Sequence, residues 1–244
     1  MKCFLHIAVL ATLPLLAQAA PQIHIGSFYD ILDSDKSVKV KVVHNTGDAT
    51  AFVKVEILEI LYAADGSSKE VSLSLDGSSV TRNGLIASPA RLIIPSRGSQ
   101  RIRLVYMGER SQERYFRLRF VPVVPEEEDK FAISSTGREE YKEALSAGIN
   151  VMTGFGSIVI VHPKESHYDT RLDDRAQQYE VRNDGNALVR LEKFKDCAKD
   201  NLDCLAPFAL YVRPGHSHTF SKQLGHTYTF ELIEGASKRT IKVQ

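Results

Sequence analysis

The chain has 244 residues, with 31 lysines and arginines against 30 aspartates and glutamates, for a net charge of +1. This balance gives no electrostatic reason to expect binding to nucleic acid or to an acidic membrane surface. Beyond the first twenty residues, no segment approaches the roughly 20 consecutive apolar residues of a membrane-spanning helix, so we expect no membrane insertion.

The first residues have the pattern of a cleaved signal peptide. Lys2 gives a positive start, residues 4–16 form a short apolar run, and Ala17-Gln18-Ala19 is a small-x-small cleavage site. We therefore expect a signal peptide over residues 1–19 and export to a soluble compartment. The remaining chain of about 220 residues suits two domains or one large sandwich.

Two cysteines remain after the leader, because Cys3 leaves with it. Cys197 and Cys204 lie in a loop rich in lysine and aspartate. In an oxidising compartment a disulfide is the default interpretation, and it would serve structure, since C-x6-C lacks the C-x-x-C geometry of redox sites. A metal site is the rival interpretation, although two thiols without a third ligand make a poor one.

The first half of the mature chain reads as a succession of short strands. Residues 22–29 open it, and residues 37–44 then alternate Val38, Val40 and Val42 against Lys39 and Lys41. β-branched residues favour a long strand over 51–62. The turns Asp65-Gly66 and Asp76-Gly77 bracket a short strand over 71–75.

Residues 89–124 are the most informative stretch of the sequence. An apolar run over 91–94 ends at the turn Pro95-Ser96-Arg97-Gly98, and two alternating strands follow over 100–106 and 114–121. Apolar residues on one face and arginines on the other predict half-buried antiparallel strands.

An acidic break over 125–129 is followed by the one helix-like patch, within 131–147, which we expect to be a long mobile loop with about one turn of helix. A strand is expected over 149–161, ended by His162-Pro163. We place a domain boundary there, giving domains over 20–162 and 163–244. Further strands are expected near 178–182, 187–194, 208–212, 218–221, 227–233 and 239–243. Many short strands with regular turns predict an all-β fold of β-sandwich type.

The order of these motifs resembles a known family, the periplasmic pilus-assembly (fimbrial) chaperones of the PapD-like type. The resemblance covers most of the mature chain and is greatest to the alternate branch, of the common-pilus type. It rests on Asn183-Asp184-Gly185-Asn186, on the Cys197/Cys204 pair, on the motif from Tyr211 to Gly215, and on Pro89, Pro95, Gly98, Gln100, Ile102, Arg103, Leu104, Glu113, Arg114, Phe116, Arg117, Phe120 and Pro122.

The resemblance implies two immunoglobulin-like β-sandwich domains in a bent arrangement with a cleft between them. It also implies a periplasmic chaperone, without enzymatic activity or cofactor, that binds pilin subunits and delivers them to an outer-membrane usher. In that family one strand completes the unfinished fold of the subunit by donor-strand complementation. On the strand over 149–161 we expect Ile149, Val151 and Phe155 to be the donors. The alternative is that this is an ordinary strand whose apolar side chains pack in the core of its own sandwich. We expect this of Val159 and Val161.

The resemblance is incomplete at the anchor for the subunit's C-terminal carboxylate. Where the best-known members carry an arginine and a lysine, this chain has Phe28 or Tyr29 and Ser157 or Ile158. A partly desolvated carboxylate needs a cation or several donors. The candidate anchors are Arg103, Arg117 and Arg119, whose alternative role is a solvated charged face.

Another pair is expected to act between the domains. His162 stands where many relatives carry an arginine, and Glu113 resembles the acid that pairs with it. We expect Glu113 and His162 to help set the angle between the domains.

Three other functions are less consistent with the sequence. The sequence has no G-x-S-x-G elbow, H-E-x-x-H helix or phosphate loop, so an enzyme is not expected. His216, His218 and His226 could form a copper or zinc site of a periplasmic metal-binding sandwich, although a polar surface hairpin is the favoured interpretation. A secreted immunoglobulin-like structural or adhesive pilus subunit is the remaining alternative. An exposed donor strand would also make a self-capping dimer plausible in the absence of subunit.

Overall fold

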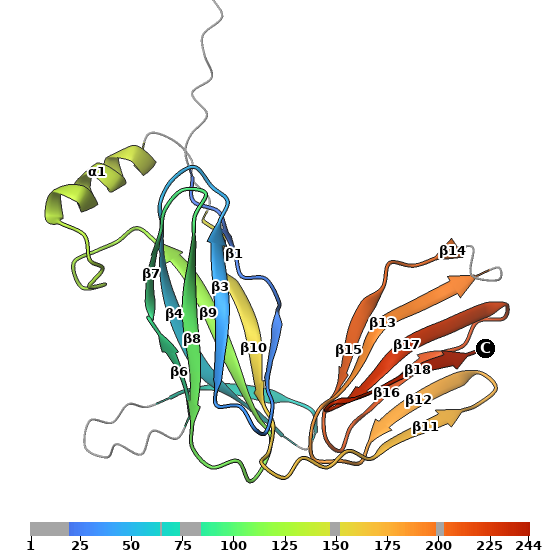
Figure 1. Ribbon diagram of the computed structural model, residues 1–244. Helices are drawn as coiled ribbons and strands as arrows, with labels where there is room; N and C mark the ends of the chain where they lie inside the picture. Colours follow the sequence, from blue (N-terminus) through green and yellow to red (C-terminus); the bar gives the residue numbers. More distant parts are fainter. Residues whose placement is uncertain (1–19, 64, 74–83, 147–151, 199–202) are drawn as a thin grey trace, which may run out of the picture.

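The computed structural model describes residues 20–63, 65–73, 84–146, 152–198 and 203–244. The expected signal peptide, Ile149 and Val151 therefore lie outside the described residues. Within the described parts the chain forms two β-sandwiches that meet at an angle (Figure 1). The all-β, two-sandwich fold expected from the sequence is confirmed.

The first sandwich is built from strands before His162. One of its sheets has the order β1-β3-β8-β6, and the other has the order β2-β10-β9-β4-β5, with β7 also paired to β4. The strands are β1 (Ile23–His24), β2 (Tyr29–Leu32), β3 (Val38–Asn45), β4 (Ala51–Tyr62), β5 (Ser68–Ser72), β6 (Gly84–Ser88), β7 (Arg91–Ile94), β8 (Ser99–Met107), β9 (Arg114–Val123) and β10 (Phe155–Val161).

The core of this sandwich is formed by the inward faces of its two sheets. On β9, Phe116, Leu118 and Phe120 are fully buried, as the alternation of the sequence predicts. Val159 and Val161 of β10 belong to the same buried cluster. The expectation that these two valines serve the chain's own core is therefore confirmed.

The second sandwich follows Pro163. Its sheets have the orders β11-β12-β16 and β14-β13-β17-β18, with β15 also paired to β13. Phe194 and Phe230 stack at its centre, 5.8 Å apart. The strands are β11 (Thr170–Asp174), β12 (Gln178–Asn183), β13 (Val189–Ala198), β14 (Asp203–Cys204), β15 (Phe208–Val212), β16 (Ser217–Ser221), β17 (His226–Glu234) and β18 (Ser237–Val243).

In the first part of β3, the lysine side chains point into the sandwich and the valine side chains point outward. Val38 and Val40 are about half exposed, whereas Lys41 is 5% exposed. The Lys41 ammonium lies 2.8 Å from the Asp30 carboxylate and donates to the Ser27 carbonyl at 2.6 Å. A buried charge requires such partners. The aspartate that selects this orientation comes from β2, in the opposite sheet.

The start of the mature chain is not one strand over 22–29. It divides into β1 and β2, which belong to different sheets. Gly26 lies between them with φ of 68°, a conformation that residues other than glycine seldom adopt. The chain crosses from one sheet to the other at this point.

The helix-like patch forms more helix than expected. Helix α1 (Ser135–Ser146) has 12 residues rather than a single turn, and the Ser134 hydroxyl accepts a hydrogen bond from the Gly137 amide at its start. Across the described ranges, no helix is long and apolar enough to cross a membrane.

Candidate functional site

Strand β10 is covered along only part of one edge. It pairs with β9 over its whole length, from Phe155 to Val161, but with β2 only from Ile158 to Val161. Among the described strands, none pairs with the other edge of Phe155, Gly156 and Ser157. The strand also begins at Phe155 rather than at 149, because Met152, Thr153 and Gly154 are not in strand.

The free edge carries an outward backbone donor. The Ile158 amide donates to the Phe28 carbonyl at 2.8 Å, so it points toward β2. Backbone direction alternates along a strand, so the Gly156 amide, two residues earlier, points to the same side. There it lies beyond the end of the pairing with β2.

Apolar rings surround this edge. Phe155 is half-buried against the core of the first sandwich, and its ring lies 6.3 Å from His24 and 6.5 Å from Phe28 between centroids. Phe28 is 54% exposed. A cavity of about 490 Å³ opens beside Phe155 and Thr153, against the first described residues of the chain. The edge therefore combines a backbone donor with exposed apolar surface.

The segment before β10 is docked on the first sandwich by aromatic contacts. Phe52 meets Phe131 and Tyr141 edge to face, and the Tyr141 hydroxyl donates to the Thr50 carbonyl at 2.8 Å. Burial raises the pKa of Tyr141 to about 12. Tyr141 and the helix contact were not expected from the sequence, which shows only a weak helical pattern there.

Two contacts between the sandwiches involve tyrosines of the first sandwich. Tyr29 of β2 stacks on Tyr211 of β15 with ring centroids 3.9 Å apart. The Arg213 guanidinium lies 3.6 Å from the centre of the Tyr62 ring. These contacts lie at the corner where the two sandwiches meet. A cavity of about 430 Å³ at this corner is lined by residues of both sandwiches, including Tyr115 and Arg213. Tyr211 and Arg213 are part of the motif that carries the resemblance, but no contact between the sandwiches is predicted for them from the sequence.

Glu113 connects three parts of the chain at the same corner. One oxygen of its carboxylate lies 2.8 Å from His162 Nδ1 and accepts the Leu188 amide at 2.6 Å. The other oxygen accepts the Tyr115 hydroxyl. The side chains of Glu113 and His162 are 3% and 5% exposed. Burial and the nearby Glu113 charge raise the pKa of Tyr115, which keeps its hydroxyl proton available.

The three candidate anchoring arginines do not lie together. Arg117 and Arg119 share one face of β9, and the Glu70 carboxylate lies between them, with its Oε1 3.0 Å from Arg117 Nε. The register places Arg117 directly beside Ile158, which is itself beside Tyr29. Arg103 is exposed on β8, in the other sheet of the sandwich.

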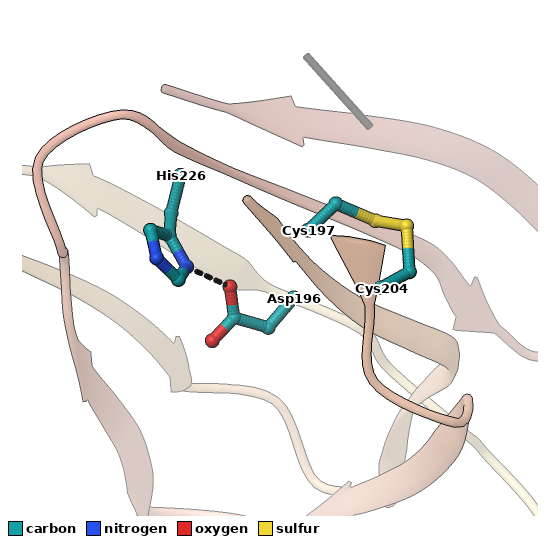
Figure 2. Close-up of a disulfide and its surroundings, with 4 residues drawn as sticks. All are labelled: Asp196, Cys197, Cys204 and His226. Carbon is teal, nitrogen blue, oxygen red and sulfur yellow. Dashed lines mark hydrogen bonds and ion pairs between the residues drawn. A yellow bond between two sulfur atoms is a disulfide. The ribbon is translucent and has the colours of Figure 1, made fainter. Parts of the chain in front are cut away.

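The expected disulfide is present. Cys197 and Cys204 are directly paired residues of β13 and β14, joined by a 2.07 Å S–S bond (Figure 2). Nearby, His226 Nδ1 lies 2.6 Å from the Asp196 carboxylate (Figure 2). His216 instead contacts Arg213 and the Pro214 carbonyl. Among the described residues, no group of three or more histidines, cysteines, aspartates or glutamates is placed to hold a metal ion.

The known proteins that this chain resembles are named as fimbrial chaperones. No protein-family model matches the chain. Proteins named "Probable fimbrial chaperone EcpB", from Escherichia coli O157:H7 and from Escherichia coli strain K12, are each 24% identical over 220 residues, 89% of this chain and 89% of theirs. The chain is therefore similar to proteins named as fimbrial chaperones along most of its length. These matches do not test the resemblance to the alternate branch of the family, which stays a prediction.

Solved structures of fimbrial chaperones have the same fold. The class 5 fimbriae chaperone CfaA matches with a TM-score of 0.53 and 17% identity, covering 91% of this chain and 99% of that one. A chain from the complex of the Salmonella enterica SafA pilin with the SafB chaperone matches with a TM-score of 0.52 and 13% identity, covering 91% and 96%. At these identities the match concerns the two-sandwich architecture.

Proposed function

We propose that this chain is a periplasmic, non-enzymatic chaperone for pilus subunits that delivers them to an outer-membrane usher. The observation that carries the proposal is the free edge of β10 at Phe155, Gly156 and Ser157, bordered by exposed apolar surface. An incomplete subunit sandwich presents the complementary features, an open apolar groove and an unpaired sheet edge.

The binding mode follows from the two halves of β10. Its C-terminal half is paired on both edges, and its side chains pack in the chain's own core. This half therefore holds the strand in place. Its N-terminal end offers a backbone ladder to the subunit, while alternate apolar side chains enter the subunit's groove. Phe155 is the described donor, and Ile149 and Val151 are proposed donors of the same face.

Arg117 is the best-placed of the candidate carboxylate anchors, with Arg119 beside it. It lies next to Ile158 on the face of the sheet that also carries Tyr29, where the two sandwiches meet. Its ion pair with Glu70 is about one-third exposed, so an incoming carboxylate could displace it at modest cost. Arg103, on the other sheet, does not fit this role.

The proposed domains run from 20 to 162 and from 163 to 244, after a signal peptide over 1–19. Every described strand pair lies on one side of His162-Pro163, which supports this division. The expected signal peptide and the similarity to fimbrial chaperones support the periplasm as the site of action. The alternative of a structural or adhesive pilus subunit is not favoured, because the relatives are chaperones.

Co-purification with pilins encoded in the same genome tests the proposal. Wild-type chain should retain a pilin, and Phe155→Asp should retain about tenfold less, because a carboxylate cannot enter an apolar groove. Leu224→Asp is the matched control, since Leu224 is fully exposed on the turn between β16 and β17. A further variant, Arg117→Ala, tests the anchor for the subunit's C-terminal carboxylate. Loss of this anchor should also reduce the amount of retained pilin.

Two results would contradict parts of this account. If no pilin is retained by the wild-type chain, the chaperone function is wrong. If a pilin is retained equally by wild type and by a folded Phe155→Asp variant, the donor assignment is wrong. Circular dichroism establishes that each variant is folded, and Phe155→Ala replaces the aspartate variant should the latter unfold.

A further inference from the structure

The second sandwich carries an exposed apolar segment beside the disulfide. Residues 205–209, here called the tip segment, are all exposed and contain no charged or hydroxyl side chain. Their sequence is Leu205-Ala206-Pro207-Phe208-Ala209, with Leu205 64% and Phe208 44% exposed. Single exposed apolar residues are common, whereas a contiguous exposed apolar run is a feature that interaction sites share.

The tip segment is held in place on both sides. Cys204, directly before it, is bonded to Cys197, and the Leu205 amide donates to the Asp196 carbonyl at 2.9 Å. At the other end, the ring of Phe208 lies 5.1 Å from that of Phe194. A surface that is already ordered loses little conformational entropy when it binds a partner.

The tip segment and the free edge of β10 lie at similar distances from the Tyr29–Tyr211 contact between the sandwiches. Tyr29 stacks on Tyr211, and Tyr29 is paired with Ile158. From this corner, β10 runs back three residues to Phe155, and β15 runs back three residues to Phe208. Each path spans about 10 Å at the usual rise of a strand.

The two strands face each other as the arms of the bend. Figure 1 shows β10 and β15 converging where the two sandwiches meet and separating away from that point. Phe155 and the tip segment lie toward the open ends of these two arms. A body the size of a protein domain seated along β10 would therefore also meet the tip segment.

We infer that the tip segment is a second contact surface for the pilin subunit bound along β10. This inference rests on the proposed chaperone function. The contact would use side chains rather than a backbone ladder, because Pro207 has no amide hydrogen to donate. Strand β10 would hold the subunit's open groove, and the tip segment would contact an apolar patch elsewhere on the same subunit.

Photo-crosslinking tests the inference within the complex. A benzophenone amino acid is placed in turn at Leu205, at Phe155 and at Leu224, and each protein is co-expressed with the pilins of the same genome. Positions 155 and 205 should crosslink to pilin, and position 224 should not, although it is the more exposed leucine of the same sandwich. Leu205→Glu should reduce retained pilin about fivefold, and Leu224→Glu should leave it unchanged.

The outcomes separate the two proposals. Crosslinking at 155 without crosslinking at 205 overturns the tip contact and leaves the chaperone function standing. A crosslink from 205 to a second copy of the chain, or to an outer-membrane protein instead of pilin, also overturns it. Absence of pilin crosslinks at both positions removes the chaperone function and the tip contact together.

Discussion

Replacing Asn45 by alanine should lower the free energy of unfolding of the first sandwich by about 3 kcal/mol or more. The Asn45 side chain, in a residue that is 1% exposed, makes five hydrogen bonds. Its amide nitrogen donates to the carbonyls of Ala49, Ile94 and Pro95, and its oxygen accepts the amides of Gln22 and Gly47. Alanine would leave these backbone groups without partners in a buried site.

Urea unfolding followed by circular dichroism measures this effect, since the chain has no tryptophan to report by fluorescence. Thr46→Ala is the control, because its hydroxyl makes only long, exposed contacts at 3.3 Å, and its effect should be below about 0.5 kcal/mol. An unfolding midpoint of Asn45→Ala equal to that of wild type would contradict the assigned role.

The second sandwich repeats the same device. Asn183 is fully buried, donates to the Ala187 and Val212 carbonyls at 2.9 Å each, and accepts the Gly185 amide at 3.0 Å. In both sandwiches the asparagine therefore bonds the amide two residues on and the carbonyl four residues on. The repetition relates the Asn-x-Gly turns of the sequence to one structural function.

Replacing Glu113 by alanine should loosen the contact between the two sandwiches and let the angle between them vary. Three donors, on His162, Leu188 and Tyr115, would lose their acceptor at once. Removing one member of a buried polar network costs several kcal/mol, because the groups left behind are not hydrated. We expect the Leu188 amide to exchange with solvent at least about tenfold faster, and solution scattering to show a broader range of interdomain angles.

Glu109→Ala provides the control for this variant, because Glu109 is exposed and four residues earlier in the same connection. It should leave both the scattering curve and the exchange at Leu188 unchanged. Unaltered interdomain geometry in a folded Glu113→Ala protein would show that Glu113 does not set the angle.

Local alternation predicted the strands well where one face of a strand is apolar and the other is charged. Strands β8 and β9 alternate apolar residues with arginines, and they form where the pattern indicates. In β3 the same pattern misleads, because the buried side carries Lys41. Its partner Asp30 lies eleven residues earlier, on a strand of the other sheet, so the alternation within β3 does not reveal the pair.

The candidate site was predicted in part. The donor strand and the Glu113–His162 pair followed from the resemblance, and the chain places this pair in direct contact. The contacts of Tyr211 and Arg213 across the corner depend on how the two sandwiches meet, which no strand pattern specifies. Helix α1 was underestimated because its stability comes from packing of Tyr141 on Phe52 rather than from its own helical pattern.

Hydrogen exchange at the Gly156 amide tests strand addition most directly. In the free protein this amide should exchange rapidly, because it points to the free edge of β10, whereas the Ile158 amide is already bonded to the Phe28 carbonyl. When a pilin binds, Gly156 should become protected by at least about tenfold while Ile158 changes little. Pilin binding that leaves the Gly156 amide exchanging as in the free protein would contradict the account.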